Sequence, residues 1–169
     1  METYELGPVT ISATVIVISR DMKALILQRL PTEKNFPNLW TVAGGKLKAT
    51  DGDFICDGFY YNTAEEAACR ELYEETGLLR GYTRPRLKYL CSITSLEATR
   101  RLILSYYLII DVDANELHIE TENGQNYKWI TESEIKNYEF IIDIGGEIKK
   151  VFKIIEDQRK AEIERIMKS

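Results

Sequence analysis

Three glutamates and an arginine are concentrated in residues 67–79, AACRELYEETGLL. On a helix that turns about 100° per residue, Glu71, Glu74 and Glu75 would share one face. Carboxylate oxygens suit Mg²⁺ or Mn²⁺, and carboxylates from one helix leave coordination positions open for water and a phosphate group. A solvated acidic helix face would show the same spacing. The segment alone therefore leaves both interpretations open.

Capping signals predict the helix that would carry these carboxylates, over about residues 63–76. Asn62 is a suitable N-cap residue, and Glu65, three residues on, would complete a capping box. Gly77 is predicted to end the helix as a C′ glycine. The glutamates would then lie in the second half of a helix of about four turns.

Alternating or β-branched apolar runs predict strands at residues 9–19, 24–30, 86–94, 101–112 and 127–130. The Asp57-Gly58 turn signal predicts a small hairpin within residues 46–61. Apolar residues at near-helical spacing predict a C-terminal helix over residues 144–167. With 169 residues, these elements fit a single α/β domain that spans residues 1–169.

The glutamate-rich segment resembles the Nudix box, G-x5-E-x7-R-E-U-x-E-E-x-G-U, in which U is aliphatic. Residues 70–78, RELYEETGL, match the second half of this pattern at every position. The upstream segments ALILQRL and LWTVAGGKL, and the downstream segment YKWITESEI, are similar to the elements that commonly flank the box. The resemblance spans about residues 10–137 and implies a Nudix-type α/β/α sandwich, with a mixed β-sheet between helices.

Two positions depart from the box. Counting back from Arg70 places Asn62 where the box has glutamate and Cys56 where it has glycine. If Gly45 is the box glycine, residues 46–61 contain an insertion of 11 residues, which is expected to reshape the mouth of the site. The loss of a carboxylate at position 62 is expected to weaken the electrostatics near a metal. Three acidic residues of the insertion stay open as substitutes, namely Asp51, Asp53 and Asp57.

By this resemblance, Glu71, Glu74 and Glu75 would be catalytic ligands of Mg²⁺ (or Mn²⁺), and the carbonyl of Gly45 a further ligand. Arg70 would orient the glutamates through charge-assisted hydrogen bonds. The implied reaction is Mg-dependent hydrolysis of a diphosphate linkage in a nucleoside diphosphate derivative or a nucleoside triphosphate.

The general base is left open between a box glutamate and two loop residues, Glu120 and Glu122. Glu122 is favoured because it lies seven residues before Trp129, close to where relatives carry acidic residues. The candidates for substrate binding are Arg29, Trp40 and Lys46. A surface salt bridge for Arg29 and a core position for Trp40 are the alternatives.

Other readings remain beside the hydrolase. A catalytically weak Nudix-fold module that binds a nucleotide is the main alternative, and it is favoured by the loss of the box glutamate at position 62. A prenyl diphosphate isomerase is disfavoured because no cysteine stands in the Gly-Gly strand.

The net charge of −5 argues against a nucleic-acid partner. The chain has neither a signal-peptide pattern nor a long apolar run, so no membrane association and a cytoplasmic location are predicted. The expected partner is a nucleotide-type small molecule, and the C-terminal helix would pack on its own core or form a homodimer.

Overall fold

The computed structural model describes residues 8–79, 86–95, 100–121 and 124–168. The chain forms two compact units. Unit 1 comprises Met1–Val15, Ala43–Leu108 and His118–Gly124, and unit 2 comprises Ile16–Val42, Ile109–Leu117 and Gln125–Ser169. No helix in the described ranges is both long enough and apolar enough to cross a membrane.

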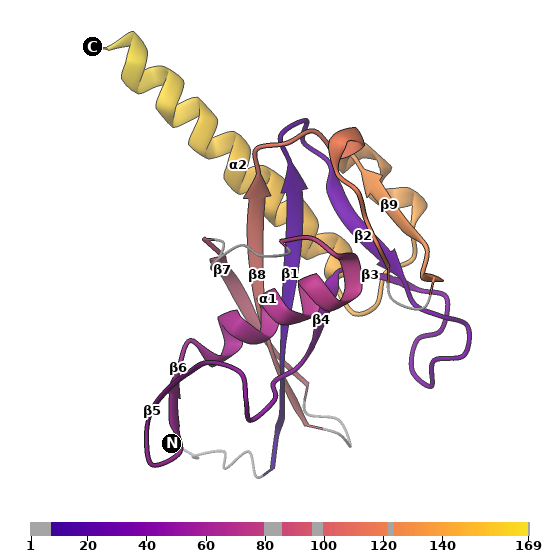
Figure 1. Cartoon of the computed structure of the whole chain (residues 1–169). Coiled ribbons are helices and arrows are strands. Elements are labelled where there is room, and N and C mark those ends of the chain that lie inside the picture. The colour runs from indigo at the N-terminus through magenta and orange to yellow at the C-terminus, as the bar shows by residue number, and fades with distance from the viewer. Residues whose placement is uncertain (1–7, 80–85, 96–99, 122–123, 169) are drawn as a thin grey trace, which may run out of the picture. The chain divides into compact units, whose positions relative to one another are not determined.

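Unit 1 contains the helix that carries the glutamates, the strands beside it and a separate hairpin. Its helix is α1 (Thr63–Thr76), and its strands are the first part of β1 (Thr10–Ser19), β4 (Ala43–Lys46), β7 (Lys88–Ser95), most of β8 (Arg101–Ile110), and the hairpin strands β5 (Asp53–Cys56) and β6 (Phe59–Tyr61). The strand β4 runs antiparallel to β1, with Gly44 opposite Thr14, and β7 runs antiparallel to β8. The helix α1 packs beside β4 (Figure 1).

The strands β1 and β8 are parallel, as their arrowheads in Figure 1 indicate. In unit 1 the backbone N–H of Thr10 donates to the carbonyl of Arg100, and in unit 2 that of Arg20 donates to the carbonyl of Val112, each at 3.0 Å. The residue numbers rise together along both strands, which requires a parallel pair. Because the other strand pairs are antiparallel, the sheet is mixed, as predicted.

Unit 2 contains the rest of β1 and a second group of strands and helices. These are β2 (Ala24–Gln28), β3 (Trp40–Thr41), β9 (Tyr127–Ile130), the 3₁₀ helices η1 (Ala114–Glu116) and η3 (Glu132–Asn137), and α2 (Ile144–Met167). The strands β1 and β2 pair antiparallel, with Ile18 opposite Ala24. The strand β2 ends at Gln28 rather than at residue 30, because the N–H of Leu30 donates to the carboxylate of Glu33 instead of continuing the ladder.

The helix α2 is confirmed over the whole predicted range and has two different halves. Its first half carries an apolar stripe of Ile148, Val151, Phe152 and Ile155, all at most 3% exposed. Burying such side chains stabilises the fold by about 1.5–3 kcal/mol each. From Glu156 onward the helix is exposed on every side.

Candidate metal and phosphate site

The helix α1 begins at Thr63, as predicted, but the contacts at its N-terminus differ from the predicted capping box. Asn62 adopts a left-handed conformation (φ 56°, ψ 25°), and its side chain makes no capping hydrogen bond. Its amide instead donates to Oδ2 of Asp53 at 3.0 Å, while Oε1 of Glu65 accepts a hydrogen bond from the hydroxyl of Tyr106 at 3.1 Å. The predicted capping box is therefore wrong, because the hairpin and β8 take the two side chains that would form it.

The other end of α1 matches the prediction. Gly77 has a φ of 68°, and its N–H donates to the carbonyl of Tyr73 at 2.9 Å, which closes the helix. Ala68, Leu72 and Thr76 lie four residues apart and are fully buried. This buried stripe sets the rotation of the helix about its axis and leaves the glutamates on another face.

Two glycines of β4 let the backbone approach the glutamates of α1. A Cβ on Gly45 would lie 2.7 Å from Oε2 of Glu71 and closer still to its other carboxylate atoms. The N–H of Gly44 donates to Oε2 of Glu75 at 3.0 Å. A side chain at position 45 would displace the Glu71 carboxylate, so the close approach requires glycine there.

Arg70 connects three carboxylates. Its Nη1 donates to Oε1 of Glu71 at 2.6 Å and to Oε2 of Glu74 at 2.9 Å. Its Nε and Nη2 donate to the two carboxylate oxygens of Asp51 at 2.8 and 3.0 Å, and Nη2 also donates to the carbonyl of Lys46 at 3.0 Å. Such bidentate, charge-assisted bonds fix both position and orientation. Arg70 thereby holds Glu71 and Glu74 in place, which is the geometry that its predicted role requires.

Asp51 is the buried member of this group, at 5% exposure. The hydrogen bonds from Arg70 hold the pKa of Asp51 below its ordinary value, against the opposing effect of burial. The same bonds from Asp51 are the main reason that the pKa of Arg70 is raised. The N–H of Lys48 also donates to Asp51, at 2.7 Å. The two ions are therefore held as a charged pair.

The position of Asp51 also changes how the sequence aligns with the box. Five residues separate Gly45 from Asp51, the spacing of the first half of the pattern, with aspartate in place of glutamate. On this alignment the extra residues lie between Asp51 and Arg70, and Asp51 rather than Asn62 stands at the position of the box glutamate. In the sequence, Asp51 is identified by counting forward from Gly45 and is missed by counting back from Arg70.

The remaining acidic residues of the segment have other contacts. Asp53 accepts the hydrogen bond from Asn62. Asp57 lies in the turn of the confirmed hairpin, with a φ of 40°. Glu74 is exposed, and its Oε1 lies 3.4 Å from Nζ of Lys48. Lys48 therefore contacts a box glutamate through its side chain, a contact that the sequence did not predict.

The three candidates for substrate binding belong to different units. Lys46 ends β4 in unit 1, with an exposed side chain. Arg29 and Trp40 belong to unit 2. Arg29 forms a salt bridge with Glu33, and such a salt bridge was the alternative to substrate binding for this residue. Trp40 packs edge-to-face on Tyr138, at 5.2 Å between ring centroids.

The predicted general base, Glu122, lies outside the described residues. The other loop candidate, Glu120, lies at the C-terminal end of α1. Its N–H donates to the carbonyl of Thr76 at 2.9 Å, and its carboxylate lies 3.5 Å from Nε2 of His118. Both contacts lie within unit 1, which also contains the box glutamates.

The donor chemistry of this cluster fits a divalent cation. Carboxylate oxygens and a glycine carbonyl are ligands that Mg²⁺ and Mn²⁺ prefer. As they stand, Glu71 and Glu74 face Arg70, and Glu75 faces the amide of Gly44. Within the described parts of the chain, no three acidic, histidine or cysteine side chains are gathered closely enough to hold a metal ion. Of the three glutamates, Glu74 is exposed, whereas Glu71 and Glu75 are half-buried.

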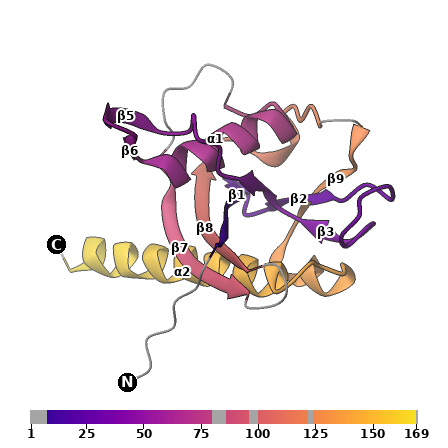
Figure 2. The ribbon, with the colours of Figure 1, turned by 90° about the horizontal axis from the view of Figure 1, so that it is seen from below.

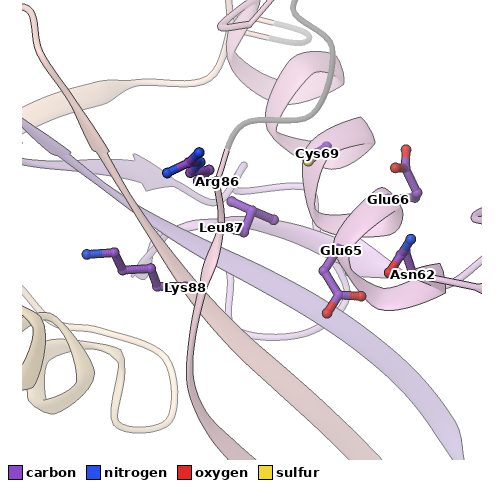
Figure 3. A pocket seen from close by; sticks show the side chains of 7 residues that line it. All are labelled: Asn62, Glu65, Glu66, Cys69, Arg86, Leu87 and Lys88. Atoms are coloured by element: carbon purple, nitrogen blue, oxygen red, sulfur yellow. The ribbon is translucent and has the colours of Figure 1, made fainter.

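A pocket of about 480 Å³ lies on the opposite side of α1 from the box glutamates. Leu87 points toward α1 in this pocket, whereas Arg86 and Lys88 extend away from the helix (Figure 3). The Nζ atom of Lys88 lies over the ring of Tyr107, at 5.6 Å from its centroid. Because the side chains of Arg86 and Lys88 extend away from α1, they do not make this pocket a phosphate-binding site. Its lining residues are Asn62, Glu65, Glu66, Cys69, Arg86, Leu87 and Lys88.

Comparisons with known proteins agree with the geometry. The family described as the NUDIX domain matches residues 8–148. Among solved structures, the MutT protein of Methanosarcina mazei Go1 is 15% identical with a TM-score of 0.62, and the match covers 89% of this chain and 97% of that one. The NUDIX domain of Shewanella oneidensis NrtR, solved with ADP ribose, is 17% identical with a TM-score of 0.65, covering 88% and 89%.

A C. elegans Ap4A hydrolase is 15% identical with a TM-score of 0.64, covering 88% of this chain and 99% of that one. At such identities the likeness is one of fold, and it confirms the predicted Nudix-type α/β class with a mixed sheet. The comparison with curated proteins gave no match. Since the family match covers most of the chain and includes the box residues around Arg70, the chain belongs to the Nudix family.

Proposed function

We propose that this protein is a metal-dependent hydrolase that cleaves a diphosphate linkage in a nucleoside diphosphate derivative or a nucleoside triphosphate. Membership of the Nudix family and the fold shared with solved Nudix proteins support a hydrolase. The observation that carries the proposal is the arrangement of Glu71, Glu74 and Glu75 around Arg70 and the two glycines of β4.

The metal would be held by the carboxylates of Glu71, Glu74 and Glu75, with the carbonyl of Gly45 as a further ligand. When bound, Mg²⁺ (or Mn²⁺) neutralises phosphate oxygens and lowers the pKa of a coordinated water. The protein's own contribution is to hold several carboxylates close together despite their mutual repulsion. Arg70 offsets that repulsion, and Asp51 holds the guanidinium in one orientation.

A carboxylate within hydrogen-bond reach must accept the proton from the attacking water. Glu122 stays the predicted base, with Glu120 and a box glutamate as the other candidates. Glu120 is bonded through its backbone to the end of α1, which supports a place for this loop near the box helix. Lys46, Arg29 and Trp40 stay predicted contacts of the substrate.

The substrate class is supported only in outline by the similar structures. The NrtR domain was solved with ADP ribose, a Francisella tularensis bifunctional enzyme with AMP and a Mn ion, and the C. elegans protein is an Ap4A hydrolase. These ligands share a nucleotide with its phosphate groups. The predicted small-molecule partner, cytoplasmic location and homodimer remain proposals for this chain.

A nucleotide-binding module without turnover is the second reading. Its main support was the missing box carboxylate at position 62, and Asp51 now supplies a carboxylate at the first-half spacing of the box. The balance therefore favours hydrolysis.

The test is a Mg²⁺ titration of the purified protein with ADP-ribose, ATP, a nucleotide sugar and diadenosine tetraphosphate, followed by released phosphate or pyrophosphate. Glu74→Gln keeps the size of the side chain and removes its charge, and we expect it to lower kcat by about a hundredfold. Glu156→Gln, on the exposed half of α2, is the matched control and should act like the parent. Metal-dependent binding without turnover across the panel would replace the hydrolase with the binding module.

A further inference from the structure

The hairpin of β5 and β6 is an insertion in the box sequence. It lies between Asp51 and Arg70, two residues that are hydrogen-bonded to each other. It begins just after Asp51 and ends at Tyr61, just before Asn62, the N-cap residue of α1. Among the described strands, β5 and β6 pair only with each other. Figures 1 and 2 both place the hairpin beyond the N-terminal end of α1. It is therefore a projecting element attached to the box helix.

The surface of this hairpin is aromatic. Phe54 and Tyr60 lie opposite each other and pack edge-to-face at 5.6 Å between ring centroids. Phe59 and Tyr61 are two residues apart, so they share the other face, and each is 66% exposed. A two-stranded hairpin alone is marginally stable in water. Phe54 is equally exposed, at 66%, but its ring packs on Tyr60. The rings of Phe59 and Tyr61 therefore offer the flat aromatic surface on which a ligand could stack.

The base of the hairpin is tightly held. Gly52 has a φ of 95°, and a Cβ there would lie 2.6 Å from the carbonyl oxygen of Tyr61, so the two ends of the hairpin touch. The bond from Asn62 to Asp53 joins them again. The residue before Gly52 is Asp51, which is bonded to the guanidinium that holds Glu71 and Glu74.

The reach from the hairpin to the box fits an extended nucleotide. Glu71 is nine positions after Asn62, which corresponds to about 13.5 Å along the helix axis. A molecule with a base at one end and a diphosphate further along is of comparable length. The acidic Asp53 and Asp57 disfavour a phosphate on the hairpin itself. The uncharged base is the part of the substrate that suits the rings.

We propose that Phe59 and Tyr61 form a stacking surface for the base of a nucleotide whose diphosphate lies at the box glutamates. This inference rests on the proposed function. Stacking of a base on an aromatic side chain is tolerant of base identity, because every base has a π face. The insertion then selects substrates that carry a base over those that carry only phosphate groups.

The test compares two probes that share a diphosphate and differ in the base, ADP and inorganic pyrophosphate. Binding to the full-length protein is measured by calorimetry with Mg²⁺ for the parent, Tyr61→Ser, Phe59→Ser and Tyr61→Phe. Loss of a ring should weaken ADP binding about tenfold and leave pyrophosphate binding unchanged. Tyr61→Phe should bind ADP like the parent. Tyr89→Ser is the matched control, since Tyr89 is an exposed ring (57%) on β7.

The outcomes separate this inference from the proposed function. Ring-dependent ADP binding without any hydrolysis would support the hairpin and overturn the hydrolase. Hydrolysis with ADP binding that does not depend on either ring would support the hydrolase and overturn the stacking surface. Equal weakening of both probes, no ADP binding by the parent, or a change only in self-association measured by sedimentation would each overturn the stacking surface.

Discussion

Arg70 and Asp51 meet through two hydrogen bonds, from Nε to Oδ1 at 2.8 Å and from Nη2 to Oδ2 at 3.0 Å. The pair joins a residue of the box helix to the segment before the hairpin. Because the same guanidinium also bonds Glu71 and Glu74, the orientation of two proposed metal ligands depends on a residue 19 positions away in the sequence.

Replacing Asp51 with asparagine tests this dependence. Asp51→Asn leaves the half-buried guanidinium of Arg70 without its bidentate anion, and removing one partner of a largely buried ion pair costs about 3 kcal/mol. We expect that loss in the free energy of unfolding by urea, together with a higher Mg²⁺ concentration for half-maximal activity. Asp51→Glu, which restores the residue of the box pattern, should recover the Mg²⁺ dependence. Asp157→Asn, at an exposed α2 pair with Lys153, should change neither quantity. An unchanged Mg²⁺ dependence in Asp51→Asn would show that Asp51 is structural only.

The glycine beside Glu71 allows a test by steric conflict. In Gly45→Ala the new Cβ overlaps the carboxylate of Glu71, so we expect a loss of about 1–3 kcal/mol in stability and a large loss of activity. In the double variant Gly45→Ala/Glu71→Ala the overlap is gone. Its loss of stability should therefore be smaller than the sum of the two single losses by at least about 1 kcal/mol, while activity stays lost. Strict additivity would mean that the two residues do not meet as described.

Asp21 predicts a pH dependence of stability. Hydrogen bonds from Lys23, from the hydroxyl of Ser19 and from the amide of Ala114 hold its pKa well below the ordinary value. A carboxyl group whose pKa is lowered by folding stabilises the protein above its unfolded pKa, and that contribution is lost as the pH falls through the folded pKa. The difference in unfolding free energy between the parent and Asp21→Asn should thus be largest near pH 7 and shrink below about pH 4. A difference that stays constant down to pH 2 would contradict this assignment.

The two halves of α2 should respond differently to truncation. Phe152 is 2% exposed, and Phe152→Ala should cost about 3–5 kcal/mol of unfolding free energy. Ile163 is 56% exposed, and Ile163→Ala should stay within about 0.5 kcal/mol. Urea unfolding of both variants measures the contrast. A large effect at Ile163 would show that the second half of the helix packs against a partner, as a homodimer through this helix requires.

Local signals in the sequence determined most of the elements. The capping glycine at position 77 predicted where α1 ends, and the Asp57-Gly58 turn predicted the hairpin of β5 and β6. The apolar spacing of residues 144–167 predicted α2 over its full length. These features depend on neighbours within a few residues, so backbone conformation and side-chain period are enough to predict them.

The contacts of the site were decided by the tertiary structure. Asn62 was a good N-cap by type, yet its side chain bonds Asp53, because the hairpin brings a carboxylate closer than the first turn of the helix does. Asp51 was one of three open candidates until the fold brought it against Arg70 and buried it. The helical period alone placed Glu71, Glu74 and Glu75 on one face. The choice of partner for each carboxylate depended on long-range packing, since a charged side chain is held by whichever opposite charge or amide the folded chain brings within reach.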